Sequence, residues 1–202
     1  MLMNQPDLFS LSPCGLSFWN EGITAAQEAS LIEHIDAEPL EPFRFQGWTG
    51  KRETHSFGWH YDFERGGFEK TDPVPHWLQP IRNSLAKLSG IAPEDLVQVL
   101  LTRYEAGAGI GWHRDRSVFN DVVGLSLGSE APLRFRRRAG SSFERYTVSL
   151  APRSVYLLSG EARNIWEHSI PPVKEPRWSI TFRTLSSNQS ARRKVAYSPN
   201  HA

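Results

Sequence analysis

Residues 97–104 read VQVLLTRY, and here the hydrophobic pattern of the chain changes from helical spacing to the alternation that is typical of β-strands. Five more short runs rich in β-branched and aromatic residues follow, separated by Gly, Pro or Ser turns: VVGLSLG, LRFRRR, RYTVSL, SVYLLSG and RWSITFRTL. The C-terminal half is therefore predicted to consist mainly of strands. Helices first and many short strands later favour an α+β fold with an antiparallel two-sheet core, such as a jelly roll, over alternating βαβ units.

Two helices are predicted upstream of this point. In ITAAQEASLIEH, Thr24 and Gln27 form a capping box that opens a helix ending near Asp36. In residues 76–90, HWLQPIRNSLAKLSG, apolar residues recur at spacings of three and four, and Gly90 stands where a helix C-terminus favours glycine. Both patterns are amphipathic, so both helices are expected to cover one face of a sheet.

Length, charge and cysteine content limit the class of protein. The 202 residues suit one domain, which we expect over residues 1–185, with the jelly-roll core at 97–185 and a polar, mobile tail at 186–202. The formal charge of +1 gives no bulk attraction to polyanions, so any basic surface must be local. A single cysteine, Cys14, the lack of a charged-then-apolar leader, and the lack of an apolar run of roughly 18 residues favour a cytoplasmic protein without membrane contact. We expect a monomer.

The stretch WHRDR, just beyond the first of these strands, places a histidine and an aspartate two positions apart. If it is extended, His113 and Asp115 point to the same face. An imidazole and a carboxylate supply two ligands of a 2-His-1-carboxylate iron site, which leaves positions open for substrate and oxygen. His168, in the downstream run NIWEHSIPP, is the expected third ligand. Because H-x-D alone is more often a surface turn or an ordinary ion pair, the motif needs support from another part of the chain.

The last predicted strand, RWSITFR, has one entirely polar face. A solvated outer face would explain this pattern, and so would the inner wall of a pocket for a small dianion. The Cα atoms of Arg177 and Arg183 are roughly 20 Å apart in an extended strand. The two side chains could therefore flank a short dicarboxylic acid, or one could bind the acid while the other organises the site. Arginine suits carboxylate recognition better than lysine because its planar fork pairs bidentately. The polar face consists of Arg177, Ser179, Thr181 and Arg183.

Taken together, RYEAGAGIGWHRD, SGEARNIWEHSIPP and EPRWSITFR resemble the AlkB family of Fe(II)- and 2-oxoglutarate-dependent dioxygenases. The resemblance covers the chain from about Phe43 to Leu185. H-x-D, a later His and R-x5-R are each weak signals, but in this order and spacing they are jointly specific. The resemblance implies a double-stranded β-helix core with N-terminal helices packed against one sheet. It also implies that His113, Asp115 and His168 hold the iron and are the catalytic residues.

A 2-oxoglutarate pocket is implied by the same resemblance. Arg177 matches the arginine that pairs with the far carboxylate of the cosubstrate, Arg183 matches the second arginine of the pocket, and Tyr104 matches the tyrosine that hydrogen-bonds the cosubstrate. Thr102 and Ser179 occupy positions where relatives often carry asparagine, and they are assigned to the same pocket. With Fe(II) and O2, such a site converts 2-oxoglutarate to succinate and CO2 and hydroxylates an N-alkyl carbon, which leaves as formaldehyde.

Residues 44–68 combine seven aromatic residues, five glycines and four Lys or Arg. Aromatic planes stack nucleobases, basic residues follow phosphates, and glycines allow a lid to move. Relatives place a nucleotide-recognition lid at this position, which makes Trp59 and Tyr61 the candidates for base contact. The alternative is a glycine-rich hairpin whose aromatic residues complete the core.

Two further features concern the substrate. The run LRFRRRAG, on a predicted hairpin between the metal ligands, is expected to contact phosphates, with Arg136 as a substrate-binding residue, although most charge runs are solvated faces. Ser117 stands where many DNA-repairing relatives carry a carboxylate that meets the damaged base; we assign it to the substrate site, and the preferred base stays open. The expected partner is single-stranded DNA or RNA with alkylated bases. The alternatives are the same chemistry on a protein or small molecule, and a catalytically silent jelly-roll binding module.

Overall fold

The computed structural model describes residues 12–45, 47–62 and 66–187, so the predicted tail lies almost entirely outside the described residues. The helices are α1 (Ala25–Ala37), α2 (Gln79–Ser89) and α3 (Gly160–Asn164), with 3-10 turns η1 (His76–Leu78) and η2 (Pro93–Asp95). The strands are β1 (Leu16–Trp19), β2 (Glu41–Phe45), β3 (Trp48–Phe57), β4 (Trp59–Tyr61), β5 (Phe68–Lys70), β6 (Gln98–Tyr104), β7 (Ile110–His113), β8 (Phe119–Gly128), β9 (Ala131–Ala139), β10 (Ser142–Leu150), β11 (Val155–Leu158), β12 (Glu167–Ile170) and β13 (Arg177–Leu185).

Both predicted helices form, and their ends have the expected caps. The Thr24 backbone N–H donates to Gln27 Oε1 at 2.9 Å, and the Gln27 N–H donates to Thr24 Oγ1 at 3.2 Å, which completes the capping box. α2 ends at Gly90, whose φ of 71° lies in the left-handed region that glycine adopts without steric cost. Among the described residues, no helix is long and apolar enough to cross a membrane.

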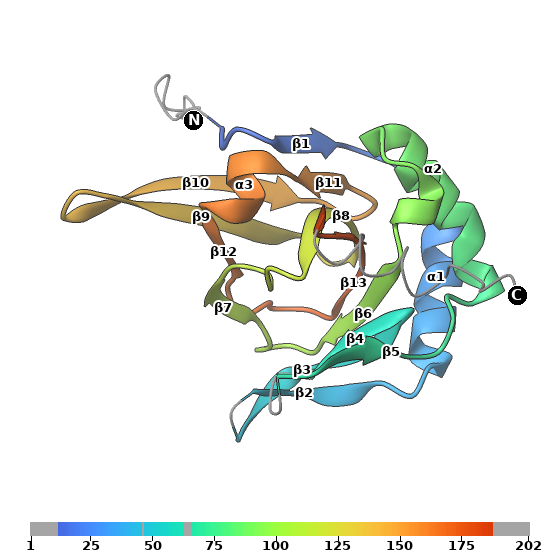
Figure 1. Cartoon of the computed structure of the whole chain (residues 1–202). Coiled ribbons are helices and arrows are strands. Elements are labelled where there is room, and N and C mark those ends of the chain that lie inside the picture. Colours follow the sequence, from blue (N-terminus) through green and yellow to red (C-terminus); the bar gives the residue numbers. More distant parts are fainter. Residues whose placement is uncertain (1–11, 46, 63–65, 188–202) are drawn as a thin grey trace, which may run out of the picture.

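The strands form two larger antiparallel sheets and one small one (Figure 1). The major sheet has the order β1-β11-β8-β13-β6-β3-β2, and the minor sheet has the order β10-β9-β12-β7. Among the described residues, β4 and β5 pair only with each other, as a separate ribbon that begins inside the predicted lid, residues 44–68, and ends at Lys70. Two facing antiparallel sheets with helices on one side confirm the predicted α+β, jelly-roll fold.

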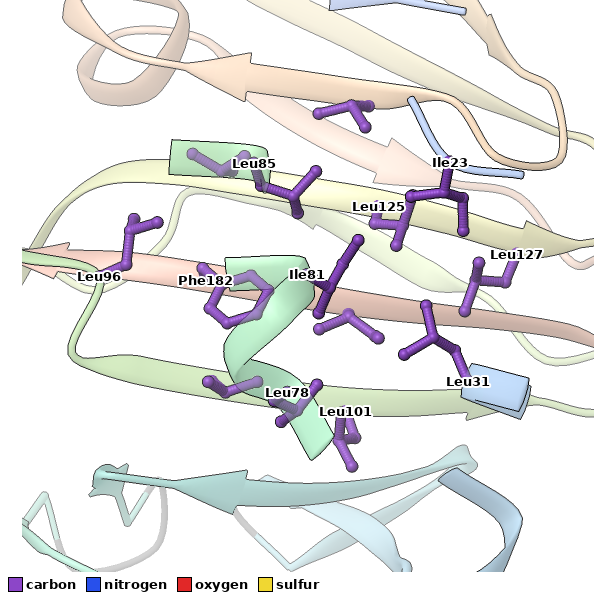
Figure 2. Packing of buried hydrophobic residues seen from close by; sticks show 14 of the residues in the cluster. Ile23, Leu31, Leu78, Ile81, Leu85, Leu96, Leu101, Leu125, Leu127 and Phe182 are labelled. Atoms are coloured by element: carbon purple, nitrogen blue, oxygen red, sulfur yellow. The ribbon is translucent and has the colours of Figure 1, made fainter. Parts of the chain in front are cut away.

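Two apolar clusters hold these layers together. In the first, α1, η1 and α2 pack onto the outer side of the major sheet, and Figure 2 shows Leu31, Leu78 and Ile81 lying over the strands that carry Leu125 and Phe182. The second cluster lies between the sheets and includes side chains from β6, β8, β9, β11 and β12. Large apolar side chains in both clusters are almost completely removed from water, which supplies the main favourable free energy of folding.

β13, at the centre of the major sheet, separates the two layers. Ile180 and Phe182 belong to the cluster beneath the helices, where Trp178 packs against it. The four polar residues that alternate with them therefore face the other way, between the sheets, and all are buried: Arg177, Ser179, Thr181 and Arg183. A solvated outer face is thus excluded as the reason for the polar alternation. The sheet instead presents a polar interior wall, which is unusual because buried polar groups require partners.

Candidate active site

The structure brings the three predicted metal ligands together. His113 is the last residue of β7, and His168 lies directly opposite it on β12 in the antiparallel register. Their rings are 4.3 Å apart between centroids, and His168 Nε2 lies 3.7 Å from Asp115 Oδ2. β7 ends at His113, so the strand does not include Asp115. The loop that follows nevertheless returns the Asp115 carboxylate to the two imidazoles.

The electrostatics of this cluster suit metal ligands. Burial, reinforced by His113, lowers the pKa of His168 to about 3, so its imidazole is neutral near pH 7, as metal binding requires. Burial alone would raise the pKa of the Asp115 carboxyl, but the charge of Arg183 and the neighbouring histidines outweigh it and hold that pKa well below its usual range. His113 Nδ1 lies 2.9 Å from the carbonyl oxygen of Gly111, a partner that leaves Nε2 for a ligand.

As they stand, the described His, Cys, Asp and Glu side chains form no group of three or more that could hold a metal ion. Asp115 Oδ1 accepts a hydrogen bond from Arg183 Nη2 at 3.1 Å, whereas its Oδ2 lies toward His168. The donor chemistry still fits Fe(II), since two imidazoles and one ionised carboxylate lie within a few ångströms of each other. His168 Nδ1 is buried and has no hydrogen-bond partner among the described residues. The cluster therefore contains a polar atom whose hydrogen bond the described side chains do not satisfy.

Arg177 is fully buried and only partly satisfied. Its Nη2 donates to Ser126 Oγ at 3.1 Å, and its guanidinium lies 5.0 Å from the centre of the Tyr104 ring. Its Nε and Nη1 have no hydrogen-bond partner, and within the described part of the chain no carboxylate pairs with it. Leaving a buried positive charge without an anion is costly. The donor set therefore indicates a binding site for an anionic ligand at this end of β13.

Arg183, at the other end of the same strand face, is paired within the protein. Its Nη1 donates to Gln98 Oε1 at 2.9 Å, and its Nη2 donates to Asp115. Arg183 therefore links the polar wall of β13 to the proposed metal ligands. Of the two arrangements left open by the spacing of the arginines, this contact favours the one in which one arginine grips the ligand and the other organises the site.

Between the two arginines lies a row of small hydroxyl side chains. Thr102 on β6 and Ser126 on β8 are both direct cross-strand neighbours of Ser179 on β13, and all three are buried. Tyr104 is the corresponding neighbour of Arg177. The predicted pocket residues thus occupy adjacent positions on three neighbouring strands. Their assignment to 2-oxoglutarate remains a prediction.

Sequence reasoning missed three residues of this wall. Gln98 and Ser126 hold Arg183 and Arg177, and Tyr156 on β11 lies over Gly124, where an added Cβ would come within 2.1 Å of the phenol Cζ. Burial raises the pKa of Tyr156 to about 12, so the phenol stays protonated near neutral pH. No motif contains these residues. The only signal in the sequence is their position on the predicted strands VQVLLTRY, VVGLSLG and SVYLLSG.

A fourth missed residue, Arg163 in α3, supports the loop that carries Asp115. Its side chain is 2% exposed, and its Nη2 donates to the carbonyl oxygens of Arg116 and Phe119 at 2.7 and 2.9 Å. The two acceptors lie on either side of the turn that follows the carboxylate. Arg163 therefore helps to fix the direction in which Asp115 points.

The predicted substrate residues lie in two places. Trp59 stacks on Phe68 across the small ribbon with ring centroids 4.8 Å apart, and Phe68 meets Phe119 edge to face at 5.5 Å. The Tyr61 ring lies 4.9 Å from the guanidinium of Arg116, one residue beyond Asp115. The ribbon thus contacts the loop and strand that follow the metal-ligand motif.

Ser117 and Arg136 have different surroundings. Ser117 is exposed in the turn that follows the H-x-D motif. Arg136 lies on β9, where its Nε is 2.6 Å from Glu167 Oε2, so much of its charge is neutralised within the protein. The proposed substrate role of Arg136 is therefore less direct than the sequence suggested.

Comparison with known proteins identifies the family. The model for the 2OG-Fe(II) oxygenase superfamily matches residues 44–193. The chain belongs to this superfamily. Fe(II), 2-oxoglutarate and O2 follow as its cofactor and cosubstrates, and the predicted class of enzyme, a 2-oxoglutarate-dependent dioxygenase, is confirmed.

Relatives of this superfamily member include AlkB homologues. The tRNA (carboxymethyluridine(34)-5-O)-methyltransferase ALKBH8 of Mus musculus is 32% identical over 168 residues, which cover 80% of this chain and 25% of that protein. RNA demethylase ALKBH9B of Arabidopsis thaliana is 28% identical over 154 residues, 68% of this chain and 30% of that protein. Uncharacterized protein L905 of Acanthamoeba polyphaga mimivirus is 30% identical over 208 residues, with 92% and 93% covered. This chain therefore spans only about a quarter of ALKBH8.

A solved structure agrees with the fold. OsALKBH1 superposes with a TM-score of 0.65 at 16% identity, and the match covers 86% of this chain and 98% of that one. This likeness shows the double-stranded β-helix fold. The family model and the AlkB homologues among the sequence relatives bear out the predicted resemblance to the AlkB family.

Proposed function

We propose that the chain oxidatively demethylates N-alkylated nucleobases in single-stranded DNA or RNA. The observation that supports this most is the fully buried Arg177, two of whose nitrogen atoms have no hydrogen-bond partner and which pairs with no carboxylate among the described residues. It lies on the same strand face as Arg183, which contacts Asp115. An anion site and a His-Asp-His cluster on one wall are what a 2-oxoglutarate oxygenase requires.

His113, Asp115 and His168 would hold the ferrous ion, and Arg177 would pair with the far carboxylate of 2-oxoglutarate. When bound, the iron supplies the oxidation in which O2 and 2-oxoglutarate yield succinate and CO2 and one oxygen atom enters the N–CH3 carbon. The C–N bond of the resulting N–CH2OH then breaks and releases formaldehyde: its electron pair returns to the base nitrogen, and the hydroxyl proton is lost to solvent.

The surrounding residues orient the reactants and exclude water. Ser126 holds Arg177, and Tyr104 packs against its guanidinium, so the fork is ordered before the carboxylate arrives. Phe135 lies 6.2 Å from the His168 ring, and Trp166 belongs to the same apolar cluster between the sheets. This apolar surrounding keeps water away from the cluster and strengthens its electrostatic interactions.

The nucleobase part of the proposal rests on the aromatic ribbon. Trp59, Phe68 and Phe119 form a chain of ring contacts, and Tyr61 packs against Arg116 next to Asp115. Aromatic rings on a glycine-rich ribbon suit the stacking of a base taken out of a strand. The names of two relatives, a tRNA methyltransferase and an RNA demethylase, are consistent with a nucleic-acid substrate.

The deciding experiment incubates the protein with Fe(II), 2-oxoglutarate and single-stranded oligonucleotides that carry 1-methyladenine or 3-methylcytosine. Mass spectrometry should show loss of the methyl group, with equal amounts of formaldehyde and succinate. His113→Ala and Arg177→Ala proteins that remain folded should release neither product. Methylated peptides serve as the control, since turnover on peptides in place of DNA and RNA would assign the same chemistry to a protein substrate.

A further inference from the structure

The minor sheet has two chemically different faces. His113, Phe135 and His168 point toward the space between the sheets, where their rings approach one another. Because side chains alternate along a strand, their neighbours in sequence project from the opposite side. We call that side the outer face; it consists of Trp112 on β7, Arg134, Arg136 and Arg138 on β9, and Phe143 and Arg145 on β10.

Guanidinium groups and aromatic rings form a continuous layer on the outer face. The Trp112 ring has Arg134 at 5.2 Å and Arg136 at 4.6 Å from its centre. The Phe143 ring has three arginines around it, Arg136 at 4.7 Å, Arg138 at 5.3 Å and Arg145 at 5.7 Å. Stacking against a ring restricts a guanidinium without using the N–H groups in its plane. These donors are therefore ordered and remain able to bind an anion.

The outer face carries excess positive charge. Glu167 pairs with Arg136 at 2.6 Å, but within the described ranges no carboxylate pairs with Arg134, Arg138 or Arg145. Arg136 and Arg145 are also direct cross-strand neighbours, an arrangement of like charges that destabilises an antiparallel pair. A chain with a formal charge of only +1 thus concentrates unpaired cations on one sheet surface. A polyanionic partner would remove this repulsion.

The outer face also adjoins the candidate active site. β7 is an edge strand of the minor sheet, and on it Trp112 and His113 are consecutive residues that face opposite ways. A strand of nucleic acid that leaves the His-Asp-His cluster need only cross this edge to reach Trp112. From β7 to β10 the sheet offers about 14 Å of surface, at the usual spacing between strands. Figure 1 shows that β9 and β10 extend farther still, as a hairpin that projects from the body of the molecule.

We propose that the outer face binds the backbone of single-stranded nucleic acid next to the nucleotide in the active site. This inference rests on the proposed function. Arginine forks match phosphate, and guanidinium and aromatic planes accept stacked bases without sequence preference, which suits a single strand better than an acidic protein. Arg138 and Arg145, exposed and free of carboxylate partners in the described structure, are the main phosphate contacts.

The test compares binding of an unmodified single-stranded oligonucleotide of about a dozen nucleotides to three proteins by fluorescence anisotropy over a range of salt concentrations. These are the wild type, the Arg138→Gln/Arg145→Gln protein, and a Lys87→Gln control, which changes an exposed lysine of α2. The double variant should bind about tenfold more weakly. The slope of its log Kd against log salt concentration should be smaller by about 1.4, because each of the two lost phosphate contacts contributes about 0.7. Lys87→Gln should match the wild type. Both arginines are exposed, and the thermal unfolding midpoint verifies that the double variant is folded.

Two results would overturn the proposal. One is a double variant whose affinity and salt slope equal those of the control. The other is competition by polyglutamate that is as effective as that of nucleic acid at equal charge, which would assign the outer face to an acidic protein.

Turnover separates this proposal from the proposed function. A methylated mononucleotide has no neighbouring phosphate that could reach Arg138 or Arg145, so the double variant should process it like the wild type, whereas its KM for a methylated dodecamer should rise about tenfold. If no oligonucleotide is demethylated by any of the proteins, the proposed function fails, and the binding titration still decides the role of the outer face.

Discussion

Arg177 and Arg183 share one face of one strand but differ in what compensates their charge. Arg183 forms hydrogen bonds with Gln98 and Asp115. Arg177 has a single hydrogen-bond partner among the described residues, the hydroxyl of Ser126. A buried charge that the protein itself neutralises contributes to the architecture of the site. One that stays unpaired costs stability until a ligand arrives. The difference predicts a structural role for Arg183 and a ligand-binding role for Arg177.

The expected effect on cosubstrate binding tests the Arg177 half of this comparison. Arg177→Met should raise the KM for 2-oxoglutarate by about 100-fold, equivalent to ~3 kcal/mol, because the carboxylate loses a bidentate charged partner. The same change should leave the free energy of unfolding in the absence of cosubstrate unchanged or higher, since it removes an uncompensated buried charge. Steady-state kinetics and urea unfolding measure the two quantities. A large loss of stability with an unchanged KM would reverse the assignment.

Arg183→Met should show the opposite balance. It leaves the buried carboxylate of Asp115 without its nearest cation, so the protein should lose about 4 kcal/mol of unfolding free energy. The affinity for Fe(II) should also fall, by about 10-fold or more, because a group that orients the Asp115 carboxylate is lost. Urea unfolding and metal titration provide the measurements, with Arg177→Met as the matched control. Equal stability losses in the two variants would show that the two arginines are not different in kind.

The strand alternation, the helix caps and the order of motifs were all readable from the sequence. What the sequence could not decide was which face of RWSITFR is buried, because a period of two is the same for a polar wall inside and a solvated face outside. It also gave no sign that β7 ends at His113, since the return of Asp115 depends on contacts with Arg183 and His168 from distant strands.

The partners of the two arginines were invisible for a related reason. Ser126 and Gln98 belong to no motif and acquire their roles only through cross-strand neighbours that lie tens of residues away. Tyr156 reaches the same wall only because Gly124, its neighbour on the next strand, has no side chain. Such contacts depend on register, which a single sequence specifies only through its overall hydrophobic pattern.

Tyr156 extends the comparison to a group that is buried without a charge. Its phenol has a pKa of about 12, raised by burial, whereas an unfolded chain gives a value near 10. The folded protein therefore holds the phenol proton more tightly than the unfolded chain does. The resulting contribution to the free energy of unfolding is complete below pH 10 and is lost as the pH rises from 10 to 12. A pKa difference of two units corresponds to at most about 3 kcal/mol of unfolding free energy. Urea unfolding of the wild type and of Tyr156→Phe at pH 9 and pH 12 should show a smaller loss in the variant; parallel losses would place the phenol in contact with solvent.

The smallest expected effect concerns the opposite side of the major sheet, where the helices contribute stability and not ligand contacts. Thr24→Ala removes the side-chain acceptor of the capping box on α1 and should cost about 1 kcal/mol of unfolding free energy. The KM for 2-oxoglutarate should not change, because Leu31 and Ile35 of α1 pack on the side of β13 that carries Ile180 and Phe182, whereas Arg177 and Ser179 face the other layer. Thermal unfolding and steady-state kinetics check both halves. A shift in KM comparable to that of Arg177→Met would mean that the two faces of β13 are coupled, so that the apolar layer takes part in setting the geometry of the anion site.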